Sequence, residues 1–158
     1  MIADADFRFA LLDLYAAYAA CLDEARFEQW PEFFTEDCLY TVQPRENFDQ
    51  GLPLATMALR GRGGLRDRIY GIQKTLFHAP YYQRHLIGPP RLCGDTGIGQ
   101  AVEANYLVVR TKRDSPSEVF NAGRYLDLIV STSDGLKFTE KRCIFDSELV
   151  LNSMIYPI

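Results

Sequence analysis

Side chains that could hold a metal ion are few in this sequence. The two histidines, His78 and His85, are seven residues apart with Pro80 between them. Proline prevents one helix from aligning them, and on a strand an odd spacing places them on opposite faces. The cysteines form no Cys-x-x-Cys pair, so they do not match the ligand spacing of zinc or iron–sulfur sites. We therefore predict no metal site in this chain, and we expect reduced, apolar thiols at Cys21, Cys38, Cys93 and Cys143.

The short motifs of nucleophilic catalysis and nucleotide binding are also missing. The sequence contains no Gly-x-Ser-x-Gly nucleophile motif and no Gly-x-Gly-x-x-Gly fingerprint. The glycine-rich run Gly61–Gly64 lacks both the Walker spacing and the Lys-Ser/Thr pair that would contact phosphates. We predict no catalytic residue and no cofactor-binding residue in this chain.

One set of residue types would suit acid–base chemistry. Tyr15, Tyr18 and Asp37 could form a buried group, and burial can raise the pKa of a carboxyl into the useful range. The same residues also have a structural interpretation. Tyrosines at helical spacing usually belong to the core, and Asp37 directly precedes an expected strand, where caps and turn residues are common. We favour the structural interpretation.

Two segments have residues suited to a contact surface. On an extended 81–88 segment, Tyr81 and His85 share one side and Tyr82 and Arg84 the other. Such an arginine could bind a carboxylate, but a polar protein interface is the favoured interpretation. The chain finishes in an apolar run, and we expect it to dock because free ends are normally solvated. The predicted interface residues are Tyr81, Tyr82, Arg84, His85, Met154, Ile155, Tyr156 and Ile158.

Composition limits the class of protein. A chain of 158 residues fits one domain, 1–158, and 47 % hydrophobic with 13 % aromatic residues allows a core plus an apolar interface. The net charge of −4 argues against nucleic-acid binding. No apolar run reaches about 18 residues, so no membrane span is predicted. Asp4 and Asp6 stand where a signal peptide would be basic, and we expect a cytoplasmic protein.

The periodicity of the sequence predicts an α+β fold. The strongest feature is a long hairpin, in which residues 119–132 alternate with a period of two before Ser133-Asp134-Gly135 makes a turn. A strand of that length spans roughly 45 Å, so the sheet must curve or be covered. Helices are expected at 4–25, 26–34 and 64–76, strands at 38–42, 54–59, 81–88 and 99–111, and an irregular segment at 45–53. The helices would pack on one face of a curved antiparallel sheet, forming a cone.

Motifs along nearly the whole chain resemble the small (beta) subunits of Rieske non-haem iron aromatic-ring-hydroxylating oxygenases. Each motif is short, and their order together carries the resemblance. They are Leu22-Asp23, Phe27-Glu28-x-Trp30-x-x-Phe33-Phe34-x-x-Asp37-Cys38-x-Tyr40, Glu46-Asn47-x-x-x-Gly51-Leu52-Pro53, Tyr81-Tyr82-x-Arg84-His85, Glu103-Ala104-Asn105-Tyr106-x-Val108-x-Arg110, Gly123-Arg124-Tyr125-x-Asp127, and Asp146-Ser147 with Asn152-Ser153.

The resemblance implies a nuclear-transport-factor-2-like (cystatin-like) cone and a structural role in a hetero-oligomer. Three small subunits would support three large (alpha) subunits, which would carry a [2Fe–2S] Rieske cluster and a mononuclear Fe(II). A ferredoxin and a reductase would deliver electrons from NADH. Within the family, the aromatic-carboxylate branch, and salicylate hydroxylases in particular, is the expected match.

The cone fold also hosts free-standing isomerases and dehydratases that use a pocket carboxylate, so the fold alone does not decide function. In the ketosteroid-isomerase-like relatives, the general base lies a few residues into the strand that follows the Asp37-like position. Here that neighbourhood is Thr41-Val42, without an acid. This departure makes the isomerase or dehydratase the alternative reading, and a plain ligand-binding or dimerisation module the third.

Overall fold

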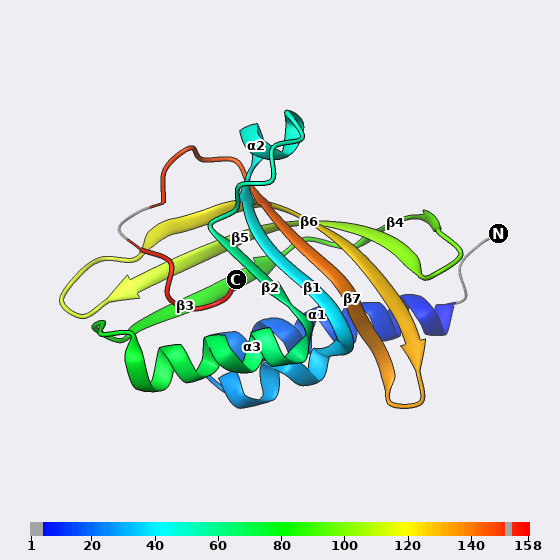
Figure 1. Cartoon of the computed structure of the whole chain (residues 1–158), viewed down its shortest axis with the longest axis horizontal. Helices are drawn as coiled ribbons and strands as arrows, with labels where there is room; N and C mark the ends of the chain where they lie inside the picture. Colours follow the sequence, from blue (N-terminus) through cyan, green and yellow to red (C-terminus); the bar gives the residue numbers. More distant parts are fainter. Residues whose placement is uncertain (1–4, 151–152) are drawn as a thin grey trace.

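A computed structural model describes residues 5–150 and 153–158. A curved sheet of seven strands is packed on one face by the two longer helices, while a short helix lies at the opposite side of the strands (Figure 1). In chain order the elements are α1 Ala5–Asp23, the 3₁₀ helix η1 Phe27–Phe33, β1 Phe34–Pro44, α2 Arg45–Asp49, β2 Met57–Arg60, α3 Gly61–Tyr70, the π-helical turn η2 Gly71–Thr75, β3 Tyr81–Ile87, β4 Arg91–Asp95, β5 Gln100–Lys112, β6 Glu118–Thr132 and β7 Gly135–Phe145. This agrees with the predicted α+β class.

The first helix is amphipathic as its sequence predicts. Its buried residues recur at spacings of three and four, because that period keeps side chains on one side of a helix. They are Leu11, Leu14, Tyr15, Tyr18, Cys21 and Leu22. The helix ends where Ala25 takes a positive φ of 54° and the Arg26 N–H bonds back to the carbonyl of Cys21. Asp4, where we expected the helix to begin, lies outside the described residues.

The predicted hairpin is formed by β6 and β7, with Gly135 at a φ of 104° in the turn. Tyr125, Asp127 and Ile129 face the helices, while Leu126 and Leu128 lie on the open face and are half-buried. An irregularity against β5, next to Val119, places Phe120 and Asn121 both in buried positions. The hairpin therefore directs one row of side chains into the interior, and α1 and α3 leave the other row uncovered.

The sheet is mixed, which corrects the expectation of a purely antiparallel one. Its order is β2-β1-β7-β6-β5-β3, with β4 paired beside β3 on β5. β1 runs parallel to β7, while every other described pairing is antiparallel. A parallel neighbour needs a long connection, which the rest of the chain provides because β1 and β7 lie near opposite ends of the sequence.

Several predicted boundaries differ from the structure. The segment 45–53 was expected to be irregular, but it begins with α2. The strand β4 follows Pro89-Pro90 directly and was not predicted. The predicted helix 64–76 begins three residues earlier, at Gly61, and its last turn is the π-helical η2. Local sequence predicts short elements poorly. In β4, pairing with β5 rather than the intrinsic preference of its residues holds the strand in place.

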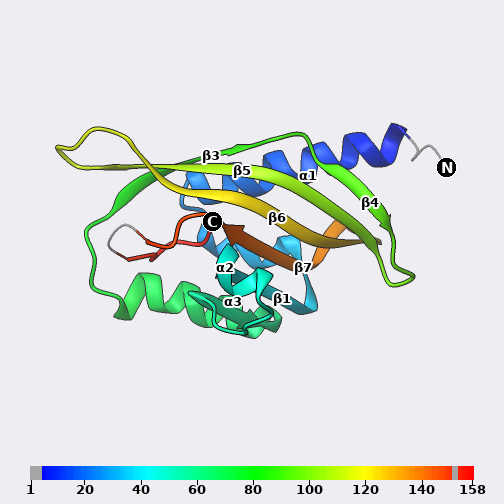
Figure 2. The same cartoon turned by 90° about the horizontal axis from the view of Figure 1, so that it is seen from above.

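Aromatic rings fill the interior between the helices and the sheet. Tyr18 of α1 contacts Phe138 edge-on at 5.5 Å between ring centroids, and Trp30 contacts Tyr40 at 5.0 Å in the same way. Edge-to-face contacts of this kind are favourable beyond the area that they bury. Seen from above in Figure 2, α1 runs behind β3 and β5, α3 lies on the opposite side, and the C-terminal end of the chain lies between the two helices. The sheet and helices thus enclose a space that large side chains occupy.

We predict that Gly123→Ala destabilises the fold. A Cβ at Gly123 would clash with the main-chain oxygen of Ile144 and come within 2.7 Å of the Cα of Phe145, so the β6–β7 pairing would have to open. Overpacking of this kind costs roughly 1–3 kcal/mol. Gly63→Ala is the matched control, since Gly63 lies in α3 with open space around it and alanine favours helix by about 1 kcal/mol. Urea unfolding of both variants measures the difference, and equal stabilities would contradict this account.

Candidate functional site

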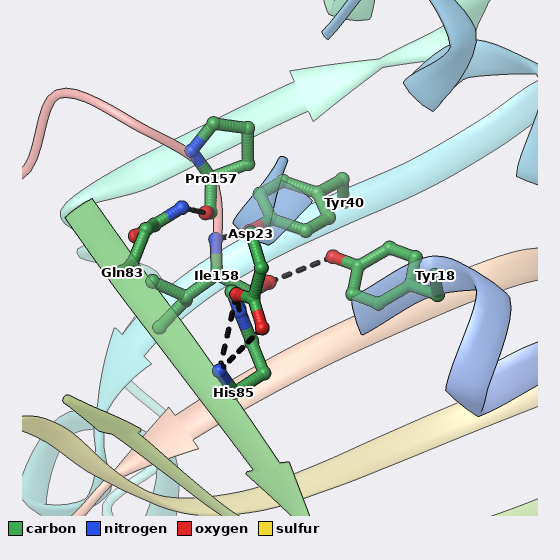
Figure 3. Close-up of polar contacts among 7 residues, drawn as sticks. All are labelled: Tyr18, Asp23, Tyr40, Gln83, His85, Pro157 and Ile158. Carbon is green, nitrogen blue, oxygen red and sulfur yellow. Dashed lines mark hydrogen bonds and ion pairs between the residues drawn. The ribbon is translucent and has the colours of Figure 1, made fainter. Parts of the chain in front are cut away.

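The interior next to the aromatic cluster is occupied by residues 154–158 of the chain itself. Met154, Tyr156 and Ile158 are buried there, and Ile155 is half-buried. The segment enters between α1, α3, β1 and β3, and Ile158 lies beside Tyr18 and Tyr40 (Figure 3). We call Met154–Ile158 the C-terminal segment.

Two tyrosine hydroxyls bind the last residue of this segment. Tyr18 donates to the main-chain oxygen of Ile158 at 2.7 Å, and Tyr40 donates to the same oxygen at 2.8 Å. The N–H of Ile158 in turn donates to the Tyr40 hydroxyl at 2.9 Å. Burial raises the pKa of both tyrosines well above the usual value, so both hydroxyls keep their protons and act as donors.

The rest of the segment is also held by side chains. The Gln83 amide donates to the carbonyl of Pro157 at 3.0 Å, and the N–H of Tyr156 donates to the Tyr81 hydroxyl at 3.0 Å. The Tyr156 ring stacks on the Tyr81 ring, with centroids 4.2 Å apart. The Arg68 guanidinium of α3 donates to the main-chain oxygens of the first two residues, at 2.8 and 2.7 Å. Every residue of the C-terminal segment therefore has a main-chain hydrogen bond to a side chain elsewhere in the protein.

A histidine–carboxylate pair joins α1 to β3 beside this segment. His85 Nδ1 lies 2.5 Å from Oδ1 of Asp23, and the main-chain N–H of His85 donates to the same carboxylate. The His85 side chain has no exposed area, and that of Asp23 is 6 % exposed. The pair therefore fixes the end of α1 against the edge strand.

A second buried polar group lies deeper, between α1 and the hairpin. Lys141 Nζ lies 2.9 Å from Oδ2 of Asp127 and 3.5 Å from the centroid of the Tyr125 ring, and the Tyr15 hydroxyl donates to Asp127. Neither charged side chain is exposed. Burial raises the pKa of the Asp127 carboxyl, while the Lys141 charge opposes that rise. Burial also raises the pKa of Tyr15, which stays protonated and donates to the carboxylate.

The favoured structural interpretation is confirmed for Tyr15 and Tyr18, which are buried in the core, whereas Asp37 lies within β1 rather than at a cap or turn. Asp37 is exposed on β1, and the carboxylate beside Tyr15 is Asp127. The sequence pattern of the hairpin could have revealed Asp127, because its spacing of two places it on the same face as Tyr125 and Ile129, the face that packs against the helices. Lys141 lies opposite Asp127 in the β6–β7 register. Because the position of the turn sets the register of a hairpin, the predicted turn also indicates approximately which residue faces Asp127.

The predicted interface residues fall into two groups. Along β3, Tyr82 is 79 % exposed and Arg84 is also exposed, whereas Tyr81 and His85 point inward as the alternation predicts. In the other group, Met154, Ile155, Tyr156 and Ile158 have contacts inside their own chain. Their contact with a partner stays a prediction, and the docking that we expected of this end occurs within this chain.

The open face of the sheet is the second candidate surface. A depression of about 400 Å³ lies over β4 to β7, with Ile98, Leu126 and Leu128 among its lining residues. Ion pairs surround it on the same face, including Arg142–Glu140 at 2.9 Å and Arg91–Glu103 at 3.0 Å. An apolar centre with a charged rim is the usual anatomy of a protein interface.

Metal-ligand side chains are scattered through the described part of the chain. Residues 5–150 and 153–158 bring together no group of three or more histidine, cysteine, aspartate or glutamate side chains that could hold a metal ion. Cys21, Cys38 and Cys143 are buried free thiols and Cys93 is exposed. Burial raises the pKa of the Cys143 thiol to about 12. Within the same residues, no helix has the length and apolar character to cross a membrane.

Comparison with known proteins identifies the family. The model of the SnoaL-like domain matches residues 4–142. The small subunit of anthranilate 1,2-dioxygenase from Burkholderia cepacia is 35 % identical over 150 residues, which is 95 % of this chain and 93 % of that one. The chain belongs to the small subunits of the aromatic-ring-hydroxylating dioxygenases. A beta 2 subunit of terephthalate 1,2-dioxygenase from Comamonas sp. is 30 % identical, over 90 % of this chain and 93 % of its own length.

A solved structure supports the same assignment. A chain from Novosphingobium aromaticivorans DSM 12444, assigned as the beta subunit of an aromatic-ring-hydroxylating dioxygenase, superposes with a TM-score of 0.86. It is 38 % identical, and the match covers 96 % of both chains. The predicted nuclear-transport-factor-2-like fold of this small subunit is thereby confirmed. Asn152, one of the residues that carry the family resemblance, lies outside the described residues.

Lys141→Met should destabilise this small subunit at neutral pH by about 3–5 kcal/mol, because it leaves the Asp127 charge buried and uncompensated. The double variant Lys141→Met/Asp127→Asn should recover part of the loss, since the uncompensated charge is then removed. Lys74→Met is the control, because Lys74 is exposed and such changes stay within about 0.5 kcal/mol.

The Lys141→Met variant should also depend on pH. Burial raises the folded-state pKa of Asp127 above its unfolded value, and the variant removes the charge that opposes the rise. As the pH falls, Asp127 of the variant is therefore protonated in the folded state before it is protonated in the unfolded state. The variant gains stability relative to the unchanged chain between pH 7 and 3.8, the ordinary pKa of an aspartate. Urea unfolding across this range measures the trend. A constant difference in stability would contradict the assigned pair.

Proposed function

We propose that this chain is the beta subunit of the terminal oxygenase in a multicomponent Rieske aromatic-ring-hydroxylating system, with a structural role. The similarity to the anthranilate dioxygenase small subunit over 95 % of the chain carries this proposal. The chain stabilises the catalytic alpha subunit, and the complex is an NADH-dependent oxidoreductase supplied through a ferredoxin and a reductase. Three alpha and three beta subunits form the assembly, in the cytoplasm.

The metal centres belong to the alpha subunit in this proposal. A Rieske cluster is held by two cysteines and two histidines, and a mononuclear iron site commonly takes two histidines and a carboxylate. The described residues of this chain gather no such set, so they do not fit either group. Electron transfer and oxygen activation therefore take place in the partner, and this chain contributes shape and contact area.

An aromatic carboxylate such as salicylate is the proposed substrate class of the complex. The relatives are named for anthranilate and terephthalate, and both compounds carry a carboxylate on an aromatic ring. The residues that select the substrate belong to the alpha subunit, because the reaction takes place at its iron. Within this class of aromatic carboxylates, salicylate is the specific substrate that we propose.

The exposed side of the edge strand β3 is the proposed contact with the alpha subunit. Tyr82 is 79 % and Leu86 53 % exposed, and Arg84 lies between them on the same side. Tyrosine and arginine are enriched among residues that dominate binding energy. The inward-facing Tyr81 and His85, with the C-terminal segment, hold this strand in place from behind.

A free-standing isomerase or dehydratase is the alternative function. The observation that favours it is Asp127, a buried carboxylate with a raised pKa that accepts a hydrogen bond from Tyr15. Against it, Asp127 is already paired with Lys141 and has no exposed side-chain area through which a substrate could reach it. Turnover by the purified chain alone, abolished by Asp127→Asn in a folded variant, would support this alternative.

We expect the chain purified alone to be colourless and to lack oxygenase activity. Co-expressed with the alpha subunit of its own system, a tagged copy should copurify with that subunit in a brown complex that hydroxylates an aromatic carboxylate. Size-exclusion chromatography with iron analysis measures the assembly. A chain that stays monomeric beside a soluble alpha subunit would contradict the proposed function.

The double variant Tyr82→Glu/Arg84→Glu should weaken association with the alpha subunit by about tenfold or more, because it reverses charge and removes a large anchor on β3. Tyr70→Glu is the matched control, since Tyr70 is 63 % exposed on α3, away from the proposed surface. Circular dichroism should show that both variants fold. If the control weakens binding as much as the double variant does, β3 is not the specific contact.

A further inference from the structure

The C-terminal segment is bound as a peptide ligand would be. Residues 153–158 belong to no helix or strand, and none of the described sheet pairings includes them. Their polar main-chain contacts come instead from side chains of α1, β1, α3 and β3. A segment held in this way can leave without breaking the hydrogen bonds between strands.

The pocket around Ile158 recognises an oxygen acceptor attached to an apolar group. Tyr18 and Tyr40 both donate to the main-chain oxygen of Ile158, and the Cys143 thiol lies 3.6 Å from it. The Ile158 residue has no exposed area. Protonated tyrosines and a thiol present donors without net charge, so the pocket suits a carbonyl or carboxylate oxygen that brings an apolar body with it.

Two buried polar atoms beside the segment have unused hydrogen-bonding capacity. Oε1 of Gln83 and Nε2 of His85 have no hydrogen-bond partner in the described part of the chain, although Gln83 is 3 % exposed and the His85 side chain fully buried. Leaving such atoms unpaired costs free energy, and structures normally satisfy them. Figure 3 shows the Gln83 side chain next to Pro157, and the His85 side chain against Asp23 on the Ile158 side of the group. The segment therefore satisfies the site only in part.

We propose that the C-terminal segment is an internal ligand in a binding site for a small amphipathic molecule with an apolar or aromatic body and a terminal carbonyl or carboxylate oxygen. Such a molecule binds when the segment leaves and accepts hydrogen bonds from Tyr18 and Tyr40. The unused atoms of Gln83 and His85 add polar contacts that the segment does not make. This inference does not depend on the proposed function, because binding is measured without oxygenation.

A variant that lacks residues 154–158 tests the site directly. Its probes are the peptide Met-Ile-Tyr-Pro-Ile, 4-isopropylbenzoate, and isopropylbenzene, which has no oxygen acceptor. The peptide should raise the midpoint of thermal unfolding, and calorimetry should show 4-isopropylbenzoate binding about tenfold more tightly than isopropylbenzene, as expected for two hydrogen bonds. Adding Tyr18→Phe/Tyr40→Phe should remove that preference. A folded variant that binds neither the peptide nor the carboxylate overturns the proposal.

A second measurement decides the matter if the shortened chain does not fold. In the unmodified chain, excess 4-isopropylbenzoate should speed hydrogen exchange at the amides of Tyr156 and Ile158, whose N–H groups bond to Tyr81 and Tyr40. The amides of Tyr125 and Cys143 in the hairpin should be unaffected, since β6 and β7 stay paired. Unchanged exchange at Tyr156 and Ile158, or equal acceleration at all four amides, overturns the proposal.

Discussion

The inner face of the curved sheet has to be filled, and this requirement governs the rest of the structure. Protein interiors are packed at nearly crystalline density, so a curved sheet cannot leave an empty space between itself and its helices. Here three kinds of group fill it: edge-on aromatic rings such as Tyr18 against Phe138, the Lys141–Asp127 pair, and the C-terminal segment. The helices alone do not complete this core.

The buried Lys141–Asp127 ion pair is an unusual component of a protein core. Removing both charges from water costs several kcal/mol, and replacing a buried pair by apolar residues is often neutral or stabilising. The cost is reduced here because Lys141 lies over aromatic faces, 3.5 Å from the Tyr125 centroid and 4.4 Å from that of Phe138, while the Tyr15 hydroxyl also donates to Asp127. The arrangement therefore fixes the position of α1 against the hairpin more than it adds stability.

Sequence periodicity predicted those parts of the fold that depend on local pattern. The stripe of α1 and the β6–β7 hairpin around Ser133-Asp134-Gly135 follow directly from spacings of three to four and of two. The parallel pairing of β1 with β7 could not be read in this way, because it joins segments about a hundred residues apart. The short strand β4 was missed for a related reason, since its pairing with β5 decides its conformation.

The candidate site shows the same limit. Both groupings that matter there, Asp127 with Tyr15 and Ile158 with Tyr18 and Tyr40, join residues more than a hundred positions apart. The sequence suggested that Tyr15 and Tyr18 are buried and that the apolar end docks. The alternation of the hairpin also indicated that Asp127 is buried, but no local pattern indicated that it meets Tyr15 or that Ile158 meets Tyr18 and Tyr40. Asp37, the carboxylate considered with these tyrosines, is exposed on β1.

The two faces of the sheet therefore have different roles. On the inner face, side chains and the C-terminal segment satisfy most hydrogen-bonding groups from within the chain. On the outer face, Leu126 and Leu128 are only half-buried, and the described elements leave a depression of about 400 Å³ beside them. In the proposed structural role, a rigid interior behind the contact surface favours binding, since ordering a loose surface on association would lower the affinity. The filled interior supplies that rigidity, because the segment and His85 hold β3 from behind while its other side stays exposed.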